Sequence, residues 1–247
     1  MADKKNISID IEDALIEKPH RFTIEAKGIG ERHFYLFPTT LGKLHLIRRM
    51  LEKLDVNTKL LATNPYMESL RLATEKKKEC CTLLAFYTFK KKRDIFDVEQ
   101  MIGRVTFFED NLTTEELAGI LLVVLTKDDV SAYKDYLGIT KENERLRQLS
   151  EYKKRVQSSQ NEYNFGCKSI YGTLIDTACE RYGWTLDYVL WGISYVNLQL
   201  LLADRIQSVF VSDEEKKKIP ARLLGDGETI KADDKAGRDK IKATNWR

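Results

Sequence analysis

The chain has 247 residues, of which 43% are hydrophobic and 32% charged, and its formal net charge is +3. This length suits one large domain or two small ones with a buried core, and the low net charge makes the whole chain a poor polyanion binder. The 4 prolines and 13 glycines leave few turns, which argues against a β-sandwich or barrel and favours helices.

The amino-terminal region, residues 1–38, predicts a small antiparallel sheet. Isoleucines alternate with polar residues between positions 7 and 11, which is the period of a half-buried strand. Two further alternating segments, at 21–26 and 32–37, are separated by a glycine turn and predict a hairpin. Because two or three short strands are only marginally stable alone, we expect this region to pack on helices.

Residues 39–157 change to the period of helices. Leucines and isoleucines between 41 and 54 recur every three or four positions and predict one helix. Asn64–Pro65 is a typical helix start, and the helix that it begins is expected to reach about residue 92. Thr113 and Glu116 have capping-box spacing before an apolar run, and a charged helix is expected at about 141–157.

Residues 158–212 predict a helical hairpin with helices at about 166–182 and 187–211, where Gly183 ends the first and Thr185 caps the second. The remaining residues, 213–247, have few apolar positions and predict a charged, extended or disordered tail. The expected fold is therefore α+β and predominantly α-helical, with a small N-terminal antiparallel β-hairpin followed by about six helices.

The predicted carboxyl-terminal helix carries an aromatic stripe. Trp184, Tyr188, Trp191 and Tyr195 follow one another at spacings of four, three and four, which puts them on one helix face. Either the chain's own core covers this face, or the face binds an amphipathic helix of a partner with the aromatic rings as anchors. The surrounding stretch, 188–203, is too short and too often interrupted by polar residues for a membrane span, so no membrane association is expected.

Charge is unevenly distributed along the chain. Residues 40–93 hold thirteen Lys and Arg against five Asp and Glu, a balance of +8, whereas residues 94–151 hold six against thirteen, a balance of −7. Opposed blocks of this kind either neutralise each other within the fold or join neighbouring copies in a homo-oligomer.

Two lysine clusters lie inside the basic block: Lys76, Lys77 and Lys78, and then Lys90, Lys91, Lys92 and Arg93. On one continuous helix the two clusters would lie on nearly the same side, about 21 Å apart along the axis. Such a stripe either binds phosphates or an acidic partner, or is a solvated helix face. Nucleic-acid binding therefore remains an alternative.

The sequence contains no familiar catalytic motif. It has no Walker, H-E-x-x-H or G-x-S-x-G pattern, and its 3 histidines lie near the amino terminus without metal-ligand spacing. The 4 cysteines, Cys80, Cys81, Cys167 and Cys179, are expected to be free, small apolar core residues in a reducing, cytoplasmic compartment. We therefore expect no enzymatic activity, no cofactor and no metal.

Two segments carry a family resemblance. Phe37–Leu44 (FPTTLGKL) follows the hairpin, and Tyr182–Leu190 (YGWTLDYVL) runs into the apolar helix. Both resemble tail assembly chaperones of long-tailed bacteriophages, in which a strand enters a T-L-G-x-L turn and a Gly-Trp turn precedes an apolar carboxyl-terminal helix. The resemblance implies a non-enzymatic morphogenesis factor of the host cytoplasm. Such a factor keeps the apolar helices of a tape-measure-type, coiled-coil client soluble during assembly.

Two alternatives to this interpretation stand beside it. One is a structural subunit of the virion or of its injection machine, such as a connector, assembled through the basic 40–93 and acidic 94–151 blocks. The other is a nucleic-acid-binding accessory protein that uses Lys76–Lys78 and Lys90–Arg93.

Overall fold

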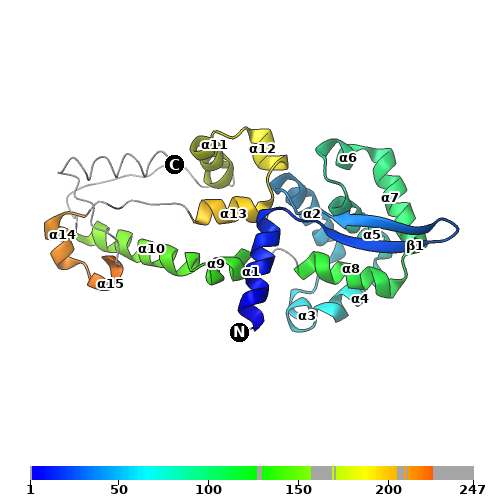
Figure 1. Ribbon diagram of the computed structural model, residues 1–247, viewed down its shortest axis with the longest axis horizontal. Helices are drawn as coiled ribbons and strands as arrows, with labels where there is room; N and C mark the ends of the chain where they lie inside the picture. Colours follow the sequence, from blue (N-terminus) through cyan, green and yellow to red (C-terminus); the bar gives the residue numbers. More distant parts are fainter. Residues whose placement is uncertain are drawn as a thin grey trace. The chain divides into compact units, whose positions relative to one another are not determined.

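A computed structural model of the chain describes residues 2–126, 130–156, 169, 171–204, 209 and 211–224. The chain forms two compact units, one made of residues 1–139 and 165–205 and the other of residues 140–164 and 206–247. The predicted α+β, mainly helical fold is confirmed, with a hairpin near the amino terminus followed by many helices (Figure 1).

The elements of the first unit are, in chain order, α1 (Ala2–Leu15), β1 (His20–Ala26), β2 (Gly30–Leu36), α2 (Leu41–Leu54), α3 (Thr58–Thr63), α4 (Pro65–Glu75), α5 (Lys77–Thr88), α6 (Lys92–Phe96), α7 (Val98–Asn111), α8 (Thr114–Thr126), α9 (Val130–Tyr136), the π-helix η1 (Tyr171–Asp176), α11 (Thr177–Tyr182), α12 (Leu186–Trp191) and α13 (Tyr195–Ala203). The second unit is built from α10 (Ile139–Val156), which leads into it from the first, α14 (Asp213–Lys218) and α15 (Ala221–Leu224).

The strand predicted at residues 7–11 is wrong, because this segment lies inside helix α1. Ile7 and Ile11 are half-buried, whereas Ile9 is 47% exposed. Residues four apart share a helix face, so the same isoleucines fit a helix as well as they fit a strand. The alternating pattern of residues 7–11 is too short to distinguish a strand from a helix.

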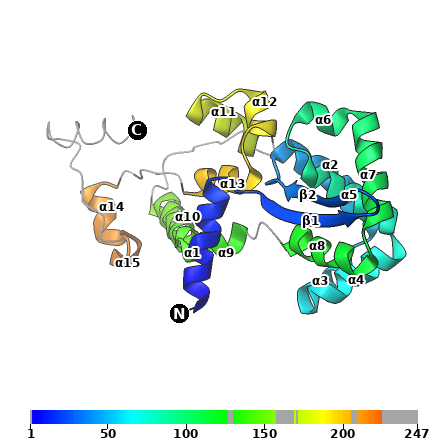
Figure 2. The same ribbon diagram turned by 45° about the vertical axis from the view of Figure 1, so that its right-hand side comes forward.

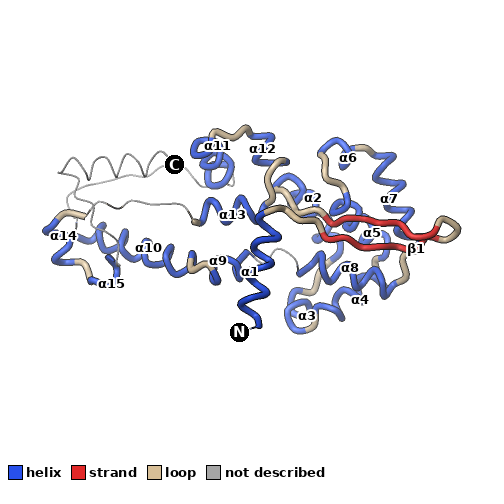
Figure 3. The backbone as a smooth tube through the Cα atoms, viewed as in Figure 1, coloured by secondary structure: helices blue, strands red, loops and turns tan. Residues whose placement is uncertain are grey.

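The predicted hairpin is confirmed, and β1 and β2 form the sheet of the described residues (Figure 3). The register sets Phe22 opposite Phe34, with ring centroids 5.6 Å apart. The Phe34 ring also meets the edge of Phe108 on α7 at 5.1 Å. These contacts attach one face of a two-stranded sheet to a helix, which supplies the stability that two strands lack alone.

Helix α5 occupies the centre of the first unit. It packs against α2, α4, α7, α8 and β2. Seven of its residues are buried, and these are Cys80, Cys81, Leu83, Leu84, Ala85, Tyr87 and Thr88. A helix that is apolar over most of its circumference needs cover on several sides, and α5 obtains it from its neighbours.

The single long helix predicted from Asn64 to about Lys92 is divided into α4 and α5, and α6 begins at Lys92, where the predicted helix was expected to end. The predicted start is right, because the Asn64 side chain accepts a hydrogen bond from the backbone N–H of Met67. The first break falls at Lys76, whose φ of −135° and ψ of 47° are not helical. No proline or glycine marks this break, so the local sequence did not reveal it.

The predicted carboxyl-terminal helix is also interrupted, by residues 192–194 between α12 and α13. Here Ser194 forms an isolated β-bridge with Thr40, and the backbone N–H of Tyr195 donates to the Thr39 carbonyl at 2.6 Å. The Ser194 N–H donates to the Glu17 carboxylate at 2.7 Å. Partners distant in sequence thus replace the hydrogen bonds that a continuous helix would make.

In the second unit, Leu149 of α10 forms a small buried cluster with Ile219 and Leu223. Ser212 and Glu215 make a complete capping box at the start of α14. The segment 213–224 was expected to be extended and instead contains two short helices. The rest of the predicted tail, Cys167 and the end of the helix predicted at 187–211 lie outside the described residues.

Candidate partner-binding surfaces

Helix α12 is short, and both of its ends are fixed by local interactions. Gly183 adopts φ 65° after α11, as its predicted C′ position requires. The Thr185 hydroxyl then accepts from the backbone N–H of Tyr188 at 3.2 Å, which confirms the predicted cap. Val189 is the buried residue of this helix, so most of its side chains lie near the surface.

The predicted aromatic stripe is separated into groups. Trp184 stacks on Tyr182 at 4.5 Å between ring centroids and meets Tyr188 edge-on at 5.2 Å. Tyr195 lies on the next helix, where its hydroxyl accepts from the side chain of Gln199 at 3.2 Å. The four predicted residues therefore do not share one helix face, because the chain turns between Trp191 and Tyr195.

Trp191 packs against α2 and α6. Its indole lies so close to Gly42 that a Cβ there would come within 2.7 Å of the ring. The indole also makes an edge-to-face contact with Phe96, with ring centroids 5.8 Å apart. The Lys92 ammonium lies 5.6 Å from the same ring and pairs with the Asp187 carboxylate at 2.9 Å. Trp191 thus joins α12 to the rest of the unit.

Several apolar side chains around α12 stay accessible. Leu186 is 53% exposed, Tyr188 44% and Phe96 57%, while Trp184 and Trp191 are half-buried. We call these five residues the α12 surface. Sequence reasoning found three of its aromatic residues and missed Phe96. Phe96 precedes α7 in a charged segment, and no period links it to Trp191.

The first lysine cluster supports the fold. Lys76 donates from Nζ to the carbonyls of Lys53 and Leu54, at the last turn of α2. Lys77 donates in the same way to the carbonyls of Glu109 and Leu112, at the end of α7. Both ammonium groups thus satisfy carbonyls that a helix end leaves without partners. The prediction that the two clusters share one helix is wrong, since they lie on α5 and around the start of α6.

The four other lysines of the two clusters differ in whether they have a partner within the fold. Lys92 is engaged by Asp187 and Trp191. Lys78, Lys90 and Lys91 are exposed and make no ion pair within the part of the chain that the structure describes. Three of the six predicted lysines therefore remain accessible for an anionic partner.

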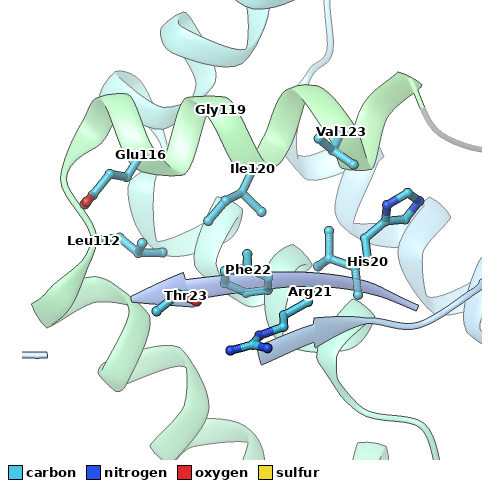
Figure 4. A pocket seen from close by; sticks show the side chains of 10 residues that line it. His20, Arg21, Phe22, Thr23, Leu112, Glu116, Gly119, Ile120 and Val123 are labelled. Atoms are coloured by element: carbon cyan, nitrogen blue, oxygen red, sulfur yellow. The ribbon is translucent and has the colours of Figure 1, made fainter. Parts of the chain in front are cut away.

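A groove of about 320 Å³ lies between α8 and the sheet, where residues of β1 and Leu36 of β2 line it. Helix α8 and β1 run side by side in Figure 1 and Figure 2, and Figure 4 shows Ile120 and Val123 directed from α8 toward the strand. Phe22 and Leu112 contribute further apolar surface. Sequence reasoning did not predict this groove, because its two walls are about ninety residues apart.

Gly119 lies in the middle of the α8 wall, and nothing is found within 4 Å of the position that its Cβ would take. A glycine inside a helix costs about 1 kcal/mol relative to alanine. Packing within this unit does not require a glycine at position 119, since a side chain there would extend into open space. Without a side chain, this part of the α8 wall stays open.

Several buried groups of the first unit have shifted pKa values. Burial raises the pKa of both Cys80 and Cys81 to about 12, so these thiols stay protonated and unreactive at neutral pH. Two hydrogen bonds from Arg71 hold the pKa of the Glu68 carboxyl below its usual value, against the opposing effect of burial. These groups belong to the core, and none of them is part of the α12 surface or of the groove lined by α8.

Among the described residues, no group of three or more His, Cys, Asp and Glu side chains is placed to hold a metal ion. Within the same residues no helix combines the length and apolar character needed to cross a bilayer. Comparison with protein-family models, with curated proteins and with solved structures gave no match. The two surfaces must therefore be interpreted from their own geometry.

Proposed function

We propose that this protein is a non-enzymatic binding factor that holds an apolar helix of another polypeptide on the α12 surface. The observation that carries the proposal is the exposure of Leu186 and Tyr188 on α12 and of Phe96, which contacts a tryptophan of that helix that packs against Gly42. Rigid, half-exposed aromatic anchors are typical of surfaces that receive an amphipathic helix. Because two segments of the sequence resemble phage tail assembly chaperones, we propose in particular that the bound helix belongs to a tape-measure-type client.

The proposal is tested with a synthetic 20-residue amphipathic helix of leucine and lysine, titrated calorimetrically into the full chain. We expect binding that persists at 1 M NaCl, because apolar contacts are not screened by salt. Combining Phe96→Ala with Tyr188→Ala should weaken the affinity about tenfold or more, the loss expected of an aromatic anchor pair. The melting temperature should fall only modestly, since Phe96 is 57% and Tyr188 44% exposed and each makes one aromatic contact.

Tyr66 provides a matched control. It is 41% exposed on α4, close to the 44% of Tyr188, and it lies away from the α12 surface. Tyr66→Ala should leave the affinity for the helix unchanged. Equal losses in Tyr66→Ala and in the double variant would contradict the proposal, as would binding that disappears at 1 M NaCl.

Nucleic-acid binding is the second candidate, supported by the exposed Lys78, Lys90 and Lys91. Replacing Lys90 and Lys91 by alanine should then reduce affinity for a 20-base single strand. That affinity should also fall steeply with salt. The engagement of Lys76, Lys77 and Lys92 within the fold makes this the weaker candidate.

A further inference from the structure

The guanidinium of Arg104 on α7 is held against two aromatic rings. Its Cζ atom lies 5.0 Å from the centroid of the Phe34 ring and 4.6 Å from that of the Phe89 ring. Its Nη1 donates to the Thr88 hydroxyl at 3.1 Å, and this hydroxyl itself donates to the Ala85 carbonyl. The two ring contacts and the hydrogen bond therefore fix the position of the guanidinium.

Arg104 forms no ion pair within the part of the chain that the structure describes. The positions that share its side of α7 lie three and four residues away, and they hold Gln100, Met101, Phe107 and Phe108. The acidic residues of α7 lie five or six positions away and project from other sides of the helix, and they are Glu99, Glu109 and Asp110. The helix therefore provides no carboxylate for this guanidinium.

Arg71 on α4 shows the contrast with a paired arginine. It pairs with Glu68 and Glu75, and its hydrogen bond to Glu68 raises the pKa of the guanidinium. Burial instead lowers the pKa of the Arg104 guanidinium, and no carboxylate of the described residues offsets that effect. Because arginine stays protonated at neutral pH, Arg104 carries a half-buried positive charge that a bound anion would stabilise.

A second arginine contacts the same group of rings. The Cζ atom of Arg32 lies 5.7 Å from the centroid of Phe107, which is 5.4 Å from that of Phe34. Arg32 is exposed and makes no ion pair within the described residues. The neighbouring Glu31 points to the other face of the sheet, where it lies opposite Glu25.

The segment after α5 adds further positive charge. Lys90 and Lys91 directly follow Phe89, whose ring contacts Arg104. Both lysines are exposed and make no ion pair within the described part of the chain. Three segments that contribute to this group of rings thus carry unpaired cations, which favours an anion with more than one negative charge.

We propose that Arg104 binds a phosphate group. The guanidinium fork donates to two phosphate oxygens, while the rings of Phe34 and Phe89 and the Thr88 hydroxyl hold it in place. Two sources share this chemistry, a small phosphorylated molecule and the phosphodiester backbone of a nucleic acid. The site is separate from the α12 surface and does not depend on the function proposed there.

The test is a titration of the full chain with inorganic phosphate at pH 8 and constant ionic strength, in which NMR follows the arginine Nε–H signals. We expect the Arg104 signal, identified by its loss in Arg104→Lys, to move. Lysine keeps the charge and loses the planar fork, so Arg104→Lys should bind phosphate about five- to tenfold more weakly. The backbone amide of Phe89 reports the affinity in both proteins. An Arg104 signal that does not move would overturn the proposal.

Arg49 provides a matched control. It is an exposed arginine of α2 that also makes no ion pair within the described residues. Arg49→Lys leaves the net charge of the chain unchanged, as Arg104→Lys does, and should bind phosphate with the affinity of the unaltered protein. Equal weakening in the two variants would overturn the location of the site.

Three further ligands define the anion on the unaltered chain, so these titrations do not depend on how well a variant folds. Acetate should bind about threefold or more weakly than phosphate, because it carries a single charge. Equal or tighter binding of acetate would overturn the assignment to phosphate. Movement of the Arg104 signal with methyl phosphate alone would identify a small phosphorylated molecule. Movement with a ten-base single strand that lacks terminal phosphates would identify a nucleic-acid backbone. Failure of both would overturn the proposal.

Discussion

Helices α5 and α12 are both rich in apolar residues, but their side chains are buried to different extents. Seven residues of α5 are buried, and five neighbouring elements surround it. Helix α12 buries Val189 and leaves Leu186 and Tyr188 exposed. The apolar side chains of α5 thus stabilise the fold, whereas two of the five apolar residues of α12 remain exposed. Apolar sequence alone does not distinguish these uses, because exposure depends on which elements arrive to cover a helix.

The sharpest test of this comparison is one leucine truncation in each helix. Leu84→Ala in α5 should lower the free energy of unfolding by about 2–5 kcal/mol, since Leu84 is wholly buried. Leu186→Ala in α12 should change it by less than about 0.5 kcal/mol. Urea denaturation followed by circular dichroism measures both. Similar losses in the two variants would remove the distinction.

Acid should destabilise the region around α5 through Glu68 on α4. Its carboxylate accepts hydrogen bonds from Arg71 and from the backbone N–H of Asn57, which keep its pKa low. Its contribution is present above the unfolded pKa of about 4.3 and is lost as the pH falls through the lower folded pKa.

Glu68→Gln should therefore cost about 1.5–3 kcal/mol at pH 7 and less at pH 3. Unfolding titrations at the two pH values measure the difference. Arg48 and Glu52 form an exposed i,i+4 pair on α2, so Glu52→Gln is the control and should cost little at either pH. A cost for Glu68→Gln that does not depend on pH would exclude its carboxylate as the titrating group.

Gly42→Ala probes the attachment of α12 to the rest of the unit. The added methyl group would lie 2.7 Å from the Trp191 ring and 2.9 Å from the Leu190 carbonyl oxygen, so the helix must shift. We expect a loss of about 1–3 kcal/mol and a red-shifted tryptophan fluorescence. Gly119→Ala, which meets no atoms, should show neither effect.

The smallest effect separates two adjacent lysines. Lys77→Met should cost about 1 kcal/mol, because the carbonyls at the end of α7 lose their charged donor. Lys78→Met should be neutral to stability, since Lys78 is exposed. Thermal denaturation of the two variants gives the comparison. Equal melting temperatures would show that the Lys77 contacts contribute nothing.

The sequence predicted those features that depend on a few neighbouring residues. The caps at Asn64, Thr113 and Thr185 are confirmed, because each rests on a hydrogen bond between residues three positions apart. The hairpin is also confirmed, because its two strands are joined by a short turn and pair within a stretch of seventeen residues. The break at Lys76 was missed, since no proline or glycine marks it, and the Lys76 ammonium donates there to carbonyls of α2 more than twenty residues away. The groove lined by α8 was missed because its walls come from segments distant in the chain.

The sequence by itself thus determined a mainly helical α+β chain with a hairpin near its start, and it identified α12 as an unusual aromatic segment. Only the tertiary structure decided which apolar and charged side chains stay accessible. It divided the aromatic stripe between two helices, engaged Lys76 and Lys77 at helix ends, and opened a groove between α8 and the sheet. The physical reason is that local structure follows from hydrogen bonds between near neighbours, whereas burial follows from packing between segments distant in the chain.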